Sequence, residues 1–134
     1  MRTLNGLKGL LVGGLLLAAG GTLAAQEAKV TPLMTKALAD YPGKEVLMAT
    51  VEYPPGSNDP IHRHNAHGFI YVLEGSIVMQ VRGGKEVTLT AGQTFYEGPE
   101  DIHIEGRNAS KTEKAKFLVF FLKNAGAPVL VPAK

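Results

Sequence analysis

Three of the four histidines in the chain, His62, His64 and His67, fall within one short window, and His103 follows 36 positions later. Neutral imidazoles are common ligands for divalent transition metals such as Fe, Mn, Ni, Cu and Zn. If residues 61–64 are extended, His62 and His64 leave the same face of a strand, because side chains alternate along it. The spacing therefore predicts two metal ligands from one strand, with His67 and His103 as the remaining candidates.

The elements expected around these histidines are short strands. From Val46 onward, β-branched and aromatic runs are separated by Gly- and Pro-containing turn signals, with roughly 8–12 residues between turns. Strands are expected at 46–53, 61–64, 69–73, 77–82, 86–90, 93–97, 102–105 and 116–122. Gly83-Gly84 is expected to make a two-residue hairpin. This pattern is typical of an all-β sandwich or barrel.

The first 25 residues predict a secretory signal peptide. Arg2 and Lys8 are followed by an apolar run at 10–19, and small residues before Gln26 offer a cleavage site. An uncleaved membrane anchor is the alternative, but the run is shorter than the roughly 20 residues that a span requires. We therefore expect a periplasmic or secreted protein with no membrane attachment after cleavage. The mature chain has no cysteine and must be stabilised by packing, with a bound metal as a further contribution.

The mature chain is expected to be a single barrel domain at 44–123, with an N-terminal arm at 26–43 and a C-terminal tail at 124–134. The arm has two readings: a short helix that begins at Thr31-Pro32, or an extended segment lying against the barrel. The tail is expected to run along the outside.

The charge of the chain argues against a nucleic-acid partner. The chain has 14 basic and 12 acidic residues, and the predicted signal peptide contains two of the basic residues and no acidic one. The mature part therefore has 12 of each, and it has no basic cluster with interleaved aromatic residues. A small-molecule ligand or substrate is the expected partner.

The two histidine-containing segments resemble the motifs of the cupin family. The first family motif runs from a glycine through His-x-His to a Val-Leu-x-Gly turn, and the second runs through Gly and Pro to His and Asn. The matching residues here are Gly56, His62-Arg63-His64, Val72-Leu73-Glu74-Gly75, Gly92 to Pro99, His103 and Asn108. The resemblance covers about residues 44–122. It implies an exported, small single-domain cupin with a jelly-roll barrel around a metal.

One departure from the family pattern leaves the ligand set open. Counting back from Gly75, the usual glutamate position of the first motif falls on Gly68, and His67 lies one residue earlier. His67 could turn inward as a fourth ligand at a bulge that Gly68 permits. Alternatively, His62, His64 and His103 hold the metal alone, or the site is degenerate and empty.

Strand alternation also predicts the walls of the barrel interior. If position 68 faces inward, Ile70 and Val72 share its face, and Met79 joins them from the next strand. These three residues are expected to form core, and as core they can also line an apolar ligand pocket. Glu105, Glu97 and Tyr96 could accept a hydrogen bond from a ligating imidazole N–H, but they are interpreted as solvated strand residues, and Asn108 as part of a turn.

Two functions from different classes fit these features. One is a cell-envelope protein that binds a small ligand at a histidine-ligated divalent metal. The other is a dioxygenase with non-haem Fe or Mn that acts on a small aromatic or thiol substrate. The absent glutamate counts against the decarboxylase and oxalate-oxidising chemistries of the family. The resemblance further implies a homodimer formed by sheet or arm exchange through the N-terminal segment, and no catalytic residue is assigned.

Overall fold

The computed structural model describes residues 26–134, so the predicted signal peptide lies outside the described residues. The strands are β1 (Lys29–Ala37), β2 (Lys44–Tyr53), β3 (His62–His64), β4 (Ala66–Glu74), β5 (Ser76–Val81), β6 (Val87–Thr90), β7 (Thr94–Glu97), β8 (Ile102–Asn108), β9 (Ala115–Asn124) and β10 (Leu130–Pro132). Residues 26–134 contain no helix that is long and apolar enough to cross a membrane.

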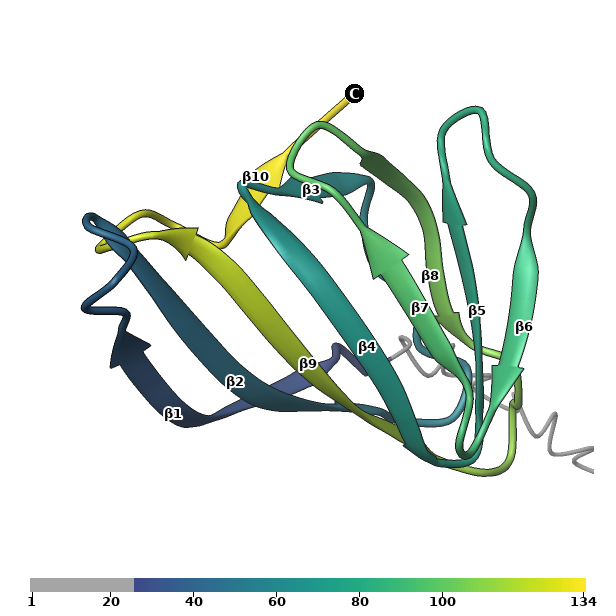
Figure 1. Cartoon of the computed structure of the whole chain (residues 1–134). Coiled ribbons are helices and arrows are strands. Elements are labelled where there is room, and N and C mark those ends of the chain that lie inside the picture. Colours follow the sequence, from purple (N-terminus) through teal and green to yellow (C-terminus); the bar gives the residue numbers. More distant parts are fainter. Residues whose placement is uncertain (1–25) are drawn as a thin grey trace, which may run out of the picture.

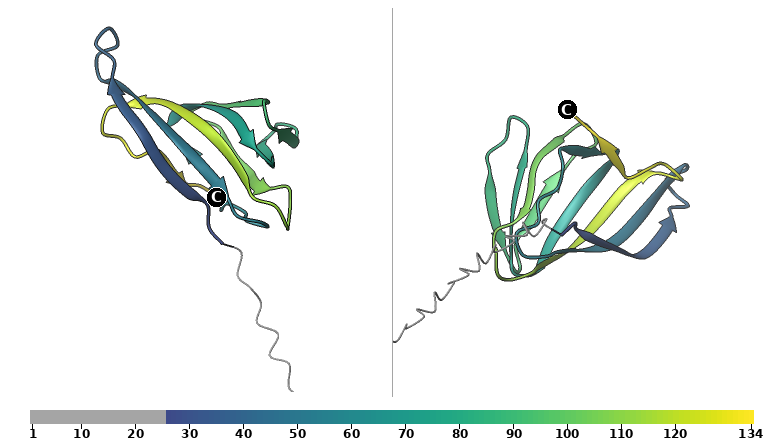
Figure 2. Two further views of the ribbon diagram at one scale, coloured as in Figure 1. Left: turned by 90° about the horizontal axis from the view of Figure 1, so that it is seen from below. Right: turned by 180° about the vertical axis from the view of Figure 1, so that it is seen from behind.

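The strands form two five-stranded antiparallel sheets that face each other. The first sheet has the order β1-β2-β9-β4-β7, and the second has the order β10-β3-β8-β5-β6. Figure 1 shows the long strands of the first sheet curving toward the second, and Figure 2 shows the layers from below and behind. The all-β fold expected from the turn spacing is therefore confirmed.

The central strand of the first sheet illustrates why the interior is apolar. In β9, the alternating residues Phe117, Val119 and Phe121 are buried, whereas the intervening side chains are partly or largely exposed. Period-two alternation of this kind directs one face of a strand into the core. From the second sheet, Ile77 and Met79 pack into the same hydrophobic core.

Both ends of the described chain form strands. Residues 29–37, for which a helix and an extended arm were open, form the edge strand β1, which pairs along its length with β2. The tail does more than run along the outside, because β10 pairs with β3 and places Leu130 opposite His64. The expected two-residue hairpin at Gly83-Gly84 is wrong, since the connection between β5 and β6 spans residues 82–86.

Candidate metal centre

The second sheet brings three of the four histidines together on its inner face. His62 and His64 leave the same side of β3, and antiparallel pairing with β8 places His103 opposite His62. One ring nitrogen from each of these residues lies within 4.8 Å of the other two. His62 and His103 are buried and His64 is partly buried. The cluster has the number and type of ligand atoms that a divalent transition metal requires.

Backbone carbonyls fix the orientation of the two rings on β3. His62 Nδ1 lies 2.7 Å from the carbonyl oxygen of Pro60, and His64 Nδ1 lies 2.9 Å from that of Val129. A carbonyl oxygen only accepts hydrogen bonds, so both Nδ1 atoms donate, and in the neutral rings both Nε2 atoms keep a lone pair. These Nε2 atoms are 3.1 Å apart. Two lone pairs at that distance repel each other unless a proton or a metal cation lies between them.

Burial keeps two of the three imidazoles in their ligating form. The pKa of His64 and that of His103 are lowered to about 4, mainly by burial and to a smaller extent by the neighbouring histidines. Both imidazoles are therefore neutral at pH 7. Neither ring nitrogen of His103 has a hydrogen-bond partner within residues 26–134, although both atoms are buried. A buried polar atom without a partner is costly, and coordination would satisfy one of these nitrogens.

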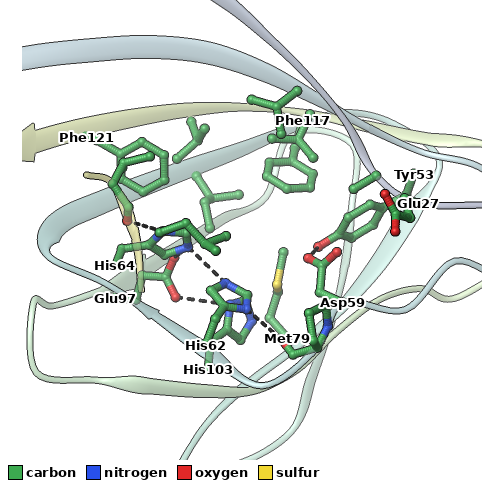
Figure 3. A pocket seen from close by; sticks show the side chains of 18 of the residues that line it. Glu27, Tyr53, Asp59, His62, His64, Met79, Glu97, His103, Phe117 and Phe121 are labelled. Carbon is green, nitrogen blue, oxygen red and sulfur yellow. Dashed lines mark hydrogen bonds and ion pairs between the residues drawn. The ribbon is translucent and has the colours of Figure 1, made fainter. Parts of the chain in front are cut away.

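Glu97 places a carboxylate against the histidines from the opposite sheet. Its Oε1 lies 3.2 Å from His64 Nε2, and its Oε2 lies 3.2 Å from His103 Nδ1 (Figure 3). The side chain comes from β7, and Glu97 is only 2% exposed, so the interpretation of Glu97 as a solvated residue is wrong. Burial raises its pKa to about 7, with smaller contributions from Asp101 and Asp59. Sequence reasoning missed this fourth group of the site.

The Glu97 carboxylate occupies the space that a side chain at position 68 would need. Gly68 on β4 pairs directly with Glu97 on β7. A Cβ atom on Gly68 would lie 3.1 Å from Glu97 Cγ, 3.3 Å from Glu97 Oε1 and 3.2 Å from Phe121 Cε1. The glutamate that the family motif expects at position 68 is thus replaced in space by one from the adjacent strand. Knowledge of the β4–β7 pairing would have been the signal for it.

His67 does not join the cluster, in contrast to the suggestion that a bulge turns it inward. β4 is regular at this point, so His67 and Gly68 face opposite sides of the sheet. The exposed His67 ring lies with Nδ1 2.8 Å from the Tyr96 hydroxyl on the outer surface. Strand alternation alone gives the correct side for this residue.

A pocket of about 380 Å³ opens beside the histidines between the two sheets. Ile70 and Met79 line it, as expected, together with the apolar side chains of β9. Val72 is fully buried and is not among the described residues that line the pocket. At the end of the pocket away from Glu97, Tyr53 donates a hydrogen bond to Asp59. The pocket therefore has apolar walls and two separate polar groups (Figure 3).

The two remaining candidates of the second motif have structural roles. The Asn108 side chain donates to the carbonyls of Tyr53, Pro54 and Glu113, and it accepts from the Ser110 backbone N–H. These bonds hold the turn after β8, in agreement with the turn interpretation. Glu105 is partly exposed and forms an ion pair of 2.7 Å with Arg107.

Comparison with known proteins gives one family and several solved structures. A family model described as a cupin domain matches residues 49–121. A structure of oxalate oxidase in complex with the substrate analogue glycolate is 28% identical, with a TM-score of 0.60 over 90% of this chain and 62% of that one. A cupin domain from Bordetella pertussis is 19% identical, with a TM-score of 0.58 over 75% of this chain and 98% of that one.

A DMSP lyase from Ruegeria pomeroyi is also 19% identical, with a TM-score of 0.58 over 66% of this chain and 43% of that one. This chain thus spans less than two thirds of both the lyase and the oxidase. A comparison with curated proteins gave no match.

Proposed function

This chain belongs to the cupin family, and from that premise we propose that it binds a small ligand at a divalent transition metal held by His62, His64 and His103. The observation that carries the proposal is the 3.1 Å approach of two Nε2 atoms whose rings are fixed by carbonyl acceptors. A bound cation removes the repulsion between those lone pairs and gives one buried nitrogen of His103 a partner.

We include Glu97 as the fourth ligand of the proposed site. Its carboxylate is buried between two imidazoles, and no lysine or arginine side chain among residues 26–134 pairs with it. A buried carboxylate without a cationic partner is unfavourable, and a divalent metal would supply that partner. Three imidazoles and one carboxylate suit Fe, Mn, Ni, Cu or Zn. Such a metal supplies Lewis acidity and open positions for a small anionic ligand.

A second candidate function is a metal-dependent enzyme that uses oxygen. The apparent lack of a carboxylate ligand argued against the oxalate-oxidising chemistry of the family, and the position of Glu97 removes that objection. The similarity to oxalate oxidase at 28% identity over 90% of this chain also favours this candidate. The other oxygen-using enzyme that fits this site is a dioxygenase that acts on small aromatic or thiol substrates.

Metal analysis and oxygen uptake test and separate these functions. We expect the purified mature protein to contain about one transition metal per chain by elemental analysis. Oxygen uptake is then measured with small carboxylates, phenols and thiols. Fe or Mn with uptake supports the enzyme, whereas Zn or Ni without uptake supports a binding protein. A chain that stays metal-free after incubation with each of these ions contradicts both.

We also propose a homodimer that forms through the outer face of the first sheet. Phe69, Tyr71, Tyr96 and Phe120 are 40–50% exposed on three adjacent strands. Exposed apolar patches of this kind mark interfaces. Exchange through β1 is the alternative, since Val30, Leu33 and Met34 are 53–59% exposed there. Light scattering should give twice the mass of one chain, and Phe69→Glu should give a monomer with unchanged metal content. A wild-type monomer at high concentration rules out the dimer.

Export to the periplasm or the medium remains part of the proposal and rests on the sequence of residues 1–25 alone. Mass spectrometry of the mature protein should find an N-terminus close to Gln26.

A further inference from the structure

The pocket contains a second acidic group close to the histidines. Tyr53 is 1% exposed and donates its hydroxyl to Asp59 Oδ2, and both residues line the pocket. Burial, together with the nearby carboxylates, raises the pKa of Tyr53 well above 10, so the phenol keeps its proton and remains a donor. Asp59 therefore acts as the acceptor. Its other oxygen has no hydrogen bond within residues 26–134 and is available to a ligand.

Gly106 allows this acidic group to approach the metal cluster. A Cβ atom on Gly106 would lie 3.2 Å from His103 Cε1, 3.2 Å from the Tyr53 hydroxyl and 3.3 Å from Asp59 Oδ2. Three side chains thus converge on the space that the glycine leaves free. The Asp59 carboxylate and the His103 ring border the same space beside Gly106, and Figure 3 shows this carboxylate facing the pocket. A short ligand bound beside the histidines reaches Asp59.

The charges that line the pocket are unbalanced. Glu27, Asp59 and Glu97 contribute carboxylates, and the described lining residues include no lysine or arginine. The proposed metal lies next to Glu97, which leaves Asp59 and Glu27 without a cationic partner. The rest of the wall is apolar and includes the rings of Phe117 and Tyr53, whose centroids are 5.3 Å apart. Carboxylates combined with aromatic rings attract organic cations.

We propose that the pocket binds a small carboxylate that carries an ammonium group, with its carboxylate at the metal and its cation beside Asp59. This inference rests on the proposed metal function, because the metal supplies the positive charge for the ligand carboxylate. Asp59 and Glu27 balance the ammonium group, and the ring of Phe117 adds a cation–π contact. The ligand's carboxylate and its ammonium group are separated by a short linker, since Asp59 and His103 border the same space beside Gly106.

Two isosteric probes test the proposal by calorimetry on the metal-loaded protein. Both probes carry a carboxylate, and each is named for its other end. The cationic probe, with a trimethylammonium group, is 3-(trimethylammonio)propanoate. The neutral probe, with an uncharged tert-butyl group, is 4,4-dimethylpentanoate, which has the same shape without the positive charge. We expect the cationic probe to bind at least about tenfold more tightly. Raising the salt concentration should reduce the part of the preference that depends on the exposed Glu27 more than the part that depends on the partly buried Asp59.

Three acid-to-amide variants assign the preference to residues. Asp59→Asn retains an acceptor for Tyr53 and is expected to bring the affinity ratio of the two probes close to one, with metal content and neutral-probe affinity unchanged. Glu27→Gln, at an exposed position that carries little folding risk, should reduce the ratio in part. Glu113→Gln is the control, because it removes the same charge at an exposed position outside the pocket.

The outcomes separate this inference from the metal function. A metal-loaded protein that binds neither probe, or binds both equally, overturns the inference and leaves the metal site intact. Retention of the preference in both Asp59→Asn and Glu27→Gln also overturns it. A chain that takes up no metal overturns the metal function and this inference with it.

Discussion

Replacement of His62, His64 or His103 by alanine is expected to lower the affinity for a divalent metal by more than about 100-fold. Each change removes one of the few ligand atoms that converge within 4.8 Å. Loss of an outer-shell partner alone typically costs about 10- to 100-fold, and loss of a direct ligand should exceed that. Elemental analysis after dialysis against limiting metal, followed by competition with a chromophoric chelator, measures the effect.

His67→Ala is the matched control for these variants. It removes an imidazole from the same part of the chain, but from the outer face, where the ring stacks on Tyr96 and hydrogen-bonds with its hydroxyl. Its metal affinity should stay within about twofold of wild type. Similar metal loss in all four variants would show that general damage to the fold, and not ligand loss, explains the result.

Thermal unfolding provides a second readout of the same prediction. A ligand that binds only the folded state at 100 times its Kd stabilises it by about 2.7 kcal/mol. Metal should therefore raise the Tm of the wild type and of His67→Ala, and a chelator should reverse the rise. The three ligand variants should show no metal-dependent rise, whatever their Tm without metal. A normal rise in all three contradicts the site.

Local sequence rules account for the fold class and for part of the site. Alternation along an extended segment is enough to place His62 and His64 on one face, and the motif resemblance identifies His103 as their partner. The same alternation gives Ile70 and Met79 as inward residues. Each of these inferences depends only on neighbouring residues or on one long-range pairing that the family pattern contains.

The rest of the site depends on pairings that no local pattern reveals. Glu97 looks like a surface residue in the sequence, because a charged side chain directly before the Gly98-Pro99 turn is usually solvated. Only the register of β4 against β7 shows that it lies opposite Gly68, in the one place on that face with no side chain. Likewise, the contact between His64 and the Val129 carbonyl requires β10 to pair with β3.

Moving the carboxylate from position 97 on β7 to position 68 on β4 is expected to preserve the metal site. Glu97→Ala should lower the metal affinity by more than about 100-fold, because it removes a direct ligand, as each histidine variant does. In the double variant Gly68→Glu, Glu97→Ala, a glutamate on β4 enters the space that Glu97 vacates, and affinity should return to within about tenfold of wild type. Titration against a chromophoric chelator measures the wild type, Glu97→Ala and the double variant.

Gly68→Glu alone is the control for crowding. Its Cβ atom would meet Glu97 Cγ at 3.1 Å and Phe121 Cε1 at 3.2 Å, and a second carboxylate would enter the same buried space. Overpacking typically costs about 1–3 kcal/mol, and the like charge adds to this. The single variant should therefore be less stable than the double variant, as denaturant unfolding in the absence of metal would measure.

The pH dependence of metal uptake tests Glu97 as a ligand independently of the double variant Gly68→Glu, Glu97→Ala. The pKa of this carboxyl is raised to about 7, mainly by burial, so it is mostly protonated at pH 6 and mostly ionised at pH 8. A carboxylate must lose its proton to bind a metal. The wild type should therefore release about 0.9 more protons per metal than Glu97→Gln at pH 6, and about 0.1 more at pH 8.

Calorimetry in buffers of different ionisation enthalpy measures that difference, and the two tests of Glu97 constrain each other. If the carboxylate only hydrogen-bonds to the imidazoles, the double variant gains no affinity over Glu97→Ala, and wild type and Glu97→Gln release equal numbers of protons. Recovery in the double variant without the proton difference would show that position 68 creates a ligand that Glu97 does not provide. Only both results together establish that β7 supplies the carboxylate ligand of this cupin.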